Sequence, residues 1–245
     1  MSRALPVIEL FGPTIQGEGP QAGQPCYFVR LGGCDFRCSW CDSMHAVDPE
    51  QVREHARQLE PIAILQELEQ LDGDPDVVVL SGGNPALHDC GELVGLLSEA
   101  GYLVAVETQG TRWKPWLEHV DMLVVSPKPP SSGMVTPGNE QIAASFMQRA
   151  MLFYEKGGEV ALKIVVFDAE DLEWAQAYLA VRPSGLPTFL SVGTPVDAPN
   201  EGEAVDQVLM RYRWLCDEVK IRPAFSQVRV MPQMHVLAWG LARAV

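Results

Sequence analysis

The sequence predicts a parallel α/β fold that forms a partial, TIM-like barrel of about six βα units. Apolar, strand-like runs alternate with amphipathic helical segments, which is the pattern of a parallel sheet with right-handed crossovers. The run Val77–Leu80 is apolar at every position, as expected of a parallel strand buried on both faces. Six units are fewer than the eight of a closed barrel, so we expect an incomplete barrel or an open sheet.

The first third of the chain is expected to hold two strands, a polar excursion and a helix. Short strands at 7–11 and 26–31 flank a loop, 12–20, that is too rich in Gly and Pro for a helix. Residues 44–60 are polar and irregular and are expected to form a surface excursion. The helix at 61–71 has a proline in its first turn and apolar residues at helical spacing.

The remaining two thirds of the chain repeat a strand followed by a helix. Polar residues with Gly or Pro follow several of these strands, as in Ser81–Pro85, Thr108–Gly110 and Ser126–Ser132. That edge of a parallel sheet is where α/β folds build active sites. The expected strands are 77–80, 103–107, 122–126, 161–167, 188–192 and 228–231, and the expected helices are 89–100, 115–118, 139–155, 169–181 and 203–217.

Length and composition limit the class of protein. The 245 residues suffice for one large domain or two small ones, and the hydrophobic content of 47% is enough for a substantial core. A net charge of −14 argues against a protein that coats nucleic acid, because binding to the phosphate backbone needs a basic face. No apolar stretch approaches the roughly 18 residues of a membrane span, and the N-terminus lacks the apolar run of a signal peptide.

The six cysteines fall into two groups. Three are crowded within residues 34–41, whereas Cys26, Cys90 and Cys216 are scattered in apolar surroundings. Scattered cysteines of this kind are expected to be buried small hydrophobes and not disulfide partners. We therefore predict a reduced, cytoplasmic protein.

Residues 32–43 contain three potential metal ligands close together in the chain. They are three cysteines at spacings of four and three: Cys34, Cys38 and Cys41. Thiolates so close together can converge on one soft metal centre, either an iron–sulfur cluster or zinc. A structural zinc site or an electron-carrying cluster takes four protein ligands. A four-iron cluster held by three cysteines instead leaves one iron open for a substrate or cofactor. The alternative is that His45 supplies the fourth ligand.

Two further segments are suited to hold a ligand. Gln16 and Glu18 are flanked by glycines that allow a close approach of the backbone to another molecule; the alternative is an N-terminal turn without function. Arg30 lies in the strand that runs into the cysteine loop. A guanidinium at that position is suited to clamp a carboxylate, and the alternative is a solvated edge residue.

With a parallel α/β pattern after it, the Cys-x3-Cys-x2-Cys loop resembles that of the radical S-adenosylmethionine (SAM) enzymes. Ser81–Pro85 is similar to the Gly-Gly-Glu-Pro motif of that family, whose backbone receives the methionine amino group of SAM, with Asn84 in place of Glu. Glu107 and Thr108 resemble the pair that contacts the ribose, and the alternative is a helix N-cap. The resemblance implies a [4Fe-4S] cluster on the three cysteines, with its open iron bound to the methionine moiety of SAM.

Within this superfamily the chain resembles, nearly end to end, the members that contract the ring of 6-carboxytetrahydropterin. The pieces that carry this resemblance are Thr14–Gly19, Arg30, Cys41–Ser43, Ser81–Pro85, Glu107–Gly110, Ser126–Pro130, Leu162–Val165 and Pro232–His235. The resemblance implies one radical SAM domain over residues 1–245, with an N-terminal substrate loop and a C-terminal extension.

The same resemblance implies roles for individual residues. The residues expected to bind the pterin and its carboxylate are Ile15, Gln16, Gly17, Glu18, Arg30 and Ser81. The residues expected to line SAM are Trp40, Cys41, Asp42, Gly83, Glu107, Ser126, Pro127 and Lys128. Ser43 falls where the family places a Mg²⁺ ligand, usually Thr, and a hydroxyl suits this hard ion; the alternative is that Ser43 caps the loop.

Three residues keep a plainer alternative. Lys128 stands at a strand end between prolines, which favours the rim of the site, although a solvated loop lysine fits the same pattern. His235 and Trp239, near the C-terminus, are expected to be packing residues more often than residues of a binding pocket.

The implied reaction begins when an electron enters the cluster and SAM is cleaved reductively to methionine and a 5′-deoxyadenosyl radical. That radical takes a hydrogen atom from the substrate carbon next to the carboxylate. The resemblance further implies ring contraction to a 7-deazapurine, loss of ammonia, and Mg²⁺ at the carboxylate. It also implies an external reductant of the flavodoxin or ferredoxin type and a homodimer.

Two rival hypotheses come from the same loop. A glycyl-radical activase shares the short cysteine loop and a similar size, but Gln16–Glu18 with Arg30 suits a small acid better than a protein substrate. The non-enzyme rival is an iron–sulfur electron carrier or a zinc module, and either of these requires a fourth ligand.

Overall fold

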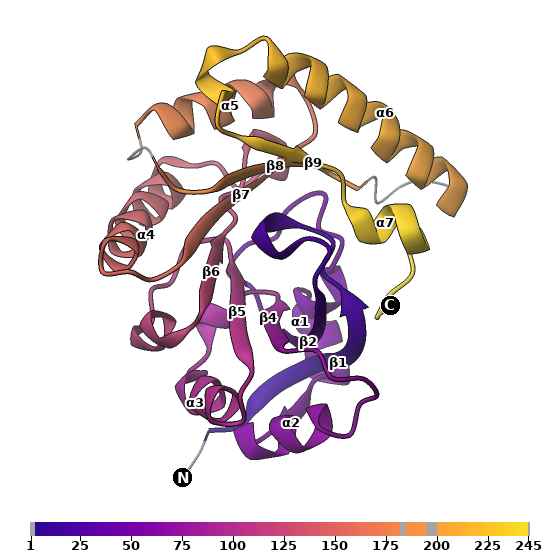
Figure 1. Cartoon of the computed structure of the whole chain (residues 1–245), viewed down its shortest axis with the longest axis vertical. Helices are drawn as coiled ribbons and strands as arrows, with labels where there is room; N and C mark the ends of the chain where they lie inside the picture. Colours follow the sequence, from indigo (N-terminus) through magenta and orange to yellow (C-terminus); the bar gives the residue numbers. More distant parts are fainter. Residues whose placement is uncertain (1–2, 182–184, 195–199, 245) are drawn as a thin grey trace.

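A nine-stranded sheet forms the centre of the protein in a computed structural model that describes residues 3–181, 185–194 and 200–244 (Figure 1). The strand order is β3-β1-β2-β4-β5-β6-β7-β8-β9. The strands from β2 to β9 are parallel to one another, whereas β1 is antiparallel to both β2 and β3. The strands are β1 Leu5–Ile15, β2 Pro25–Leu31, β3 Arg57–Leu59, β4 Val77–Gly82, β5 Leu103–Thr108, β6 Met122–Val125, β7 Val160–Val166, β8 Thr188–Val192 and β9 Arg229–Met231.

The helices that connect the parallel strands cover one face of the curved sheet (Figure 1). The α-helices of the described residues are α1 Pro49–His55, α2 Pro61–Leu68, α3 Gly91–Glu99, α4 Pro137–Glu155, α5 Ala169–Ala180, α6 Glu201–Lys220 and α7 Met234–Trp239, of which α7 follows the last strand and lies beside the cavity described below. The sheet does not close, since β3 and β9 are its two edges. The expectation of an α/β, partial TIM-like barrel is therefore confirmed. None of the described helices is long and apolar enough to cross a membrane.

Two expectations for the first third of the chain were wrong. The first strand does not end at residue 11 but continues to Ile15, because Thr14 and Ile15 still pair with Cys26 and Pro25 across a register shift after Phe11. A bulge of this kind lets a strand absorb residues that break regular pairing. The loop that follows β1 therefore starts at Gln16.

Residues 44–60 are not irregular, because they contain α1 and β3. Helix α1 begins with Asp48 as its N-cap, whose side chain accepts hydrogen bonds from the backbone N–H groups of Glu50 and Gln51, and with a proline in the first turn. The helix buries no residue, so its sequence has no apolar stripe. A cap and a proline were the only signals of this helix.

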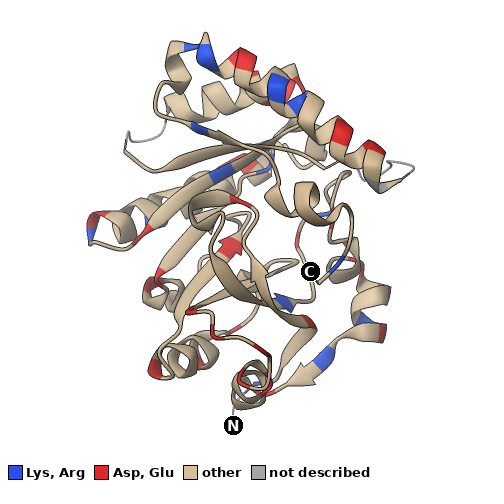
Figure 2. Ribbon diagram, turned by 45° about the vertical axis from the view of Figure 1, so that its right-hand side comes forward, with Lys and Arg blue, Asp and Glu red and all other residues tan. Residues whose placement is uncertain are grey.

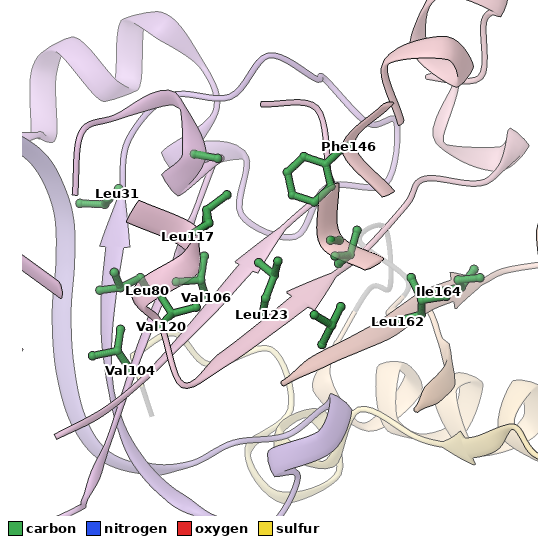
Figure 3. Packing of buried hydrophobic residues seen from close by; sticks show 14 of the residues in the cluster. Leu31, Leu80, Val104, Val106, Leu117, Val120, Leu123, Phe146, Leu162 and Ile164 are labelled. Carbon is green, nitrogen blue, oxygen red and sulfur yellow. The ribbon is translucent and has the colours of Figure 1, made fainter. Parts of the chain in front are cut away.

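The two faces of the sheet have different roles. Leu80, Val106, Leu123 and Leu162 point into the helix-covered core, where they are fully buried (Figure 3). Side chains alternate along a strand, so the residues between them face the inside of the open barrel. Charged residues are spaced along the outer helix α6, whereas most of the sheet carries none (Figure 2).

The scattered cysteines follow the expectation in part. Cys26 and Cys90 are fully buried, while Cys216 on α6 is half-buried. All six thiols are free. Burial raises the pKa of Cys26 and of Cys90 to about 12, so neither thiol is reactive near neutral pH.

Candidate active site

A cavity of about 540 Å³ opens inside the barrel at the carboxyl ends of the parallel strands. Its walls come from the end of β1, the cysteine loop, the ends of β4 to β8 and the segment after β9. The expected site residues that line it are Ile15, Gln16, Gly17, Glu18, Arg30, Cys34, Cys38, Trp40, Cys41, Asp42, Ser43, Ser81, Gly83, Glu107, Ser126 and Lys128. Pro127 lines a neighbouring cavity of about 240 Å³ instead.

The cysteine loop packs directly on the Gly82–Gly83 turn after β4. A Cβ added to Gly83 would lie 2.0 Å from the carbonyl oxygen of Gly33, so only glycine allows this approach of the two backbones. The N–H of Asn84 donates to that same carbonyl over 2.8 Å. The two motifs that suggested a cofactor site in the sequence are therefore in contact.

Asn84, which stands where the Gly-Gly-Glu-Pro motif has Glu, forms hydrogen bonds to three other side chains. Its side-chain amide donates to Asp35 and to Thr111, and its oxygen accepts from the hydroxyl of Thr108 over 2.8 Å. Asn84 is fully buried. It therefore joins the cysteine loop to the end of β5.

The other side of the cysteine loop is tied to the segment after β6. The indole N–H of Trp40 donates to Ser131 Oγ over 2.8 Å, and Ser39 Oγ donates to the Ser131 carbonyl over 2.6 Å. Ser131 in turn donates through its N–H and its hydroxyl to Asp171, which is fully buried on α5. Burial raises the pKa of the Asp171 carboxyl. The loop is thus held on both sides.

The three loop thiols suit an iron–sulfur cluster. Burial raises the pKa of Cys34 and Cys38, and it raises that of Cys41 to about 11, so the metal-free thiols are protonated and binding of a metal releases their protons. The Phe36 N–H and the Gln109 amide both donate to Cys34 Sγ over 3.4 Å. Hydrogen bonds of this kind tune sulfur ligands.

The described residues contain no group of three His, Cys, Asp or Glu side chains already gathered for a metal. His45, the alternative fourth ligand, places Nε2 3.3 Å from Glu9 Oε2. That contact turns this ring nitrogen toward β1.

Arg30 belongs to the cavity wall, not to a solvated edge. Its side chain is only 17% exposed, its Nε lies 2.7 Å from Glu9 Oε2, and its Nη1 donates to Ser43 Oγ over 2.9 Å. The hydrogen bond from His45, followed by the charge of Arg30, overcomes burial and lowers the pKa of Glu9 to about 2. The guanidinium is thus fixed beside Ser43, whose hydroxyl donates to Asp42 over 3.0 Å.

Glu107 faces the inside of the barrel and does not cap a helix. Its carboxylate accepts from the Gln16 amide over 3.2 Å and lies 3.1 Å from Lys163 Nζ. Lys163 also lies 2.9 Å from Glu18. The role of Lys163 was missed by sequence reasoning, although one signal for it existed, a single charge within an apolar strand.

Lys128 turns toward the cavity. Its ammonium donates to Ser126 Oγ over 2.9 Å and lies 5.7 Å from the centre of the Trp40 ring. Trp40 packs on Phe167 with ring centres 5.0 Å apart. Lys128 is therefore not a solvated loop lysine.

The segment after β9 closes the remaining side of the cavity. The Met234 N–H donates to the Gly17 carbonyl over 3.1 Å, and a Cβ on Gly17 would lie 2.2 Å from His235 Nδ1. His235 lines the cavity, whereas Trp239 is 38% exposed and does not. Of these two residues only His235 belongs to the site.

Comparison with known proteins agrees with this geometry. Residues 28–127 match the model of the radical SAM superfamily. The 7-carboxy-7-deazaguanine synthase of Bacillus subtilis (strain 168) is 40% identical and is covered over 100% of both chains. That of Bacillus cereus is 39% identical over 98% of this chain and 99% of its own. The crystal structure of QueE from Escherichia coli has the same fold, with a TM-score of 0.66, 24% identity and 94% of each chain covered.

Proposed function

This chain belongs to the 7-carboxy-7-deazaguanine synthases of the radical SAM superfamily, and we propose that it converts 6-carboxy-5,6,7,8-tetrahydropterin to 7-carboxy-7-deazaguanine. The reaction is a ring contraction with loss of ammonia in the biosynthesis of queuosine and related 7-deazapurines. When bound, the [4Fe-4S] cluster supplies an electron, and SAM supplies the radical that abstracts a hydrogen atom from the substrate. The observation that carries this proposal is a single cavity shared by three thiols and a set of groups suited to a small acid.

The thiols of Cys34, Cys38 and Cys41 hold the cluster in this proposal. The backbone of the Gly82–Gly83 turn and the side chain of Glu107 would bind SAM, and Lys128, which lines the same cavity, would pair with the carboxylate of SAM. Lys128 lies over the ring of Trp40, which packs on Phe167. The side chains of Glu107, Lys128 and Trp40 are each already held by a partner within the chain, which keeps them in place before the ligand arrives.

The opposite wall receives the pterin. Arg30, fixed by Glu9, offers its guanidinium to the substrate carboxylate, and Ser43 places its hydroxyl beside it for Mg²⁺. The loop from Gln16 to Glu18 offers amide and carboxylate groups to the polar edge of the ring. Glu18 lines the cavity, and Lys163 and Gln233 both form hydrogen bonds with its carboxylate. A carboxylate accepts several hydrogen bonds, so Glu18 is suited to accept an N–H of the pterin.

The proposal extends to the whole chain and its surroundings. Residues 1–245 act as one domain, in which the loop after β1 and the segment after β9 complete the substrate wall. A flavodoxin or ferredoxin supplies the electron, and the enzyme works as a cytoplasmic homodimer. Size-exclusion chromatography with light scattering tests the homodimer, and activity with each reductant tests the donor.

One anaerobic incubation tests the function itself. The reconstituted enzyme is mixed with 6-carboxytetrahydropterin, SAM, Mg²⁺ and a chemical reductant, and the products are separated by mass. We expect 7-carboxy-7-deazaguanine and ammonia in equal amounts. A reconstituted protein that binds SAM but leaves the pterin unchanged would contradict the proposed reaction.

A further inference from the structure

A single lysine lies in the middle of an otherwise apolar strand. All seven residues of β7, which has the sequence Val-Ala-Leu-Lys-Ile-Val-Val, are buried. Leu162 and Ile164 point into the helix-covered core (Figure 3), whereas Lys163 points the other way and lines the cavity. Burying an ammonium is costly unless it is paired. The role of Lys163 therefore depends on the groups that pair with its ammonium.

Lys163 joins two carboxylates from distant parts of the chain. Its Nζ lies 2.9 Å from Glu18 Oε2 and 3.1 Å from Glu107 Oε2. Gln16 connects the same two glutamates by hydrogen bonds. Its amide nitrogen donates to Glu107 Oε1 over 3.2 Å, and its amide oxygen accepts from the backbone N–H of Glu18 over 3.2 Å. These four residues form what we call the charged ring.

The pairing favours the ionised forms of Glu18 and Lys163. Burial would raise the pKa of Glu18, but the ammonium of Lys163, together with His235 and Gln233, outweighs it and lowers that pKa to about 2. Burial would also lower the pKa of Lys163, but Glu107 and Glu18 outweigh it and raise that pKa. The ammonium is therefore charged near neutral pH.

The charged ring spans the two halves of the site. Gln16 and Glu18 belong to the loop that receives the pterin, and Glu107 belongs to the side that receives SAM. We propose that Lys163 is a positioning residue that couples pterin binding to SAM binding, an inference that rests on the proposed function. Its ammonium sets the distance between the two walls, and so the distance between the substrate carbon and the group that takes its hydrogen. A misplacement of about 1 Å can cost about 10²-fold in rate.

Equilibrium binding provides the first test, in enzyme with an oxidised cluster, which does not turn over. We expect SAM to raise the affinity for the pterin by about fivefold or more, the lower end of usual coupling factors. Lys163→Gln should bring this factor close to one, and Lys163→Arg, which keeps the charge, should retain part of it. Lys220→Gln is the control, because Lys220 is an exposed lysine that pairs with Asp217 on α6.

The second readout is the ratio of 5′-deoxyadenosine to pterin product in the reduced enzyme. Lys163→Gln should raise this ratio by about tenfold or more, because SAM is cleaved while the substrate is misplaced. A lysine that only stabilised the fold would lower both yields together and leave the ratio unchanged. Thermal melting of each variant measures that structural contribution separately.

Three outcomes overturn the inference. Equal coupling factors in the wild type and Lys163→Gln would do so whatever the activity. If Lys163→Gln does not fold, the wild type and Lys163→Arg provide the test. A wild type without coupling contradicts the inference. So does a Lys163→Arg variant with undiminished coupling and an unchanged ratio of 5′-deoxyadenosine to pterin product. A wild type that shows coupling but forms no product would instead contradict the proposed function alone.

Discussion

Arg30 is the residue whose removal should best separate the pterin side of the site from the SAM side. Its guanidinium is held by Glu9 at 2.7 Å and by Ser43 at 2.9 Å, and it lines the cavity with 17% of its side chain exposed. A hydrogen bond to a charged group contributes about 1.5–3 kcal/mol. Arg30→Ala should therefore weaken pterin binding by roughly 10- to 140-fold, while SAM binding and uncoupled SAM cleavage persist.

Anaerobic titration calorimetry with the pterin, and separately with SAM, measures both affinities in this variant. Arg57→Ala is the matched control, because Arg57 also forms an arginine–carboxylate pair, with Glu67 at 2.8 Å, but is 51% exposed and lies outside the cavity. An equal loss of SAM affinity in Arg30→Ala would place Arg30 in the SAM half or in the fold. An unchanged pterin affinity would refute the carboxylate clamp.

The remaining predictions concern the cluster, the pH dependence and the metal. Replacing any one of the three loop cysteines by Ala should abolish both the four-iron absorption and SAM cleavage, whereas Cys90→Ala should keep them; a full-strength cluster in any loop variant would contradict the assignment. The folded-state pKa of Glu9, about 2, lies below its ordinary 4.5, so its contribution to stability is present above pH 4.5 and is lost as the pH falls toward 2. Denaturant unfolding should show a smaller acid loss for Glu9→Gln than for the wild type, and identical pH curves would exclude this contribution. Mg²⁺ should stimulate product formation in the wild type and in Ser43→Thr but little in Ser43→Ala, and equal stimulation in all three would place the ion elsewhere.

The parallel strands and the position of the site could be predicted because both depend on local signals. A continuous apolar run such as Val77–Leu80 has few alternatives to a doubly buried strand. Polar residues with Gly or Pro after such a run then mark the carboxyl edge of the sheet. Three motifs that follow different strands had to meet at that edge, and the cavity contains residues of all three.

The contacts that orient the site could not be predicted, because they join residues far apart in the chain. The sequence pattern around Glu9 does not indicate that its partner is Arg30. The antiparallel pairing of β1 with β2 is what brings the two side chains together. Lys163 reads as an anomaly within β7, and its partners are 145 and 56 residues away. Local propensity cannot show which carboxylate meets which cation.

Arg30, Lys163 and Lys128 differ in how much of their positive charge is already paired within the chain and how much is left to pair with a ligand. Arg30 and Lys163 are each paired with carboxylates, so much of their charge is already balanced. Lys128 donates to the Ser126 hydroxyl and lies near the face of Trp40, and no carboxylate in the described part of the chain forms an ion pair with it. An ammonium in that position has more to gain from an incoming carboxylate than Arg30 or Lys163 has. We therefore expect the SAM carboxylate at Lys128, and the function of Lys163 to be the alignment of its two protein partners.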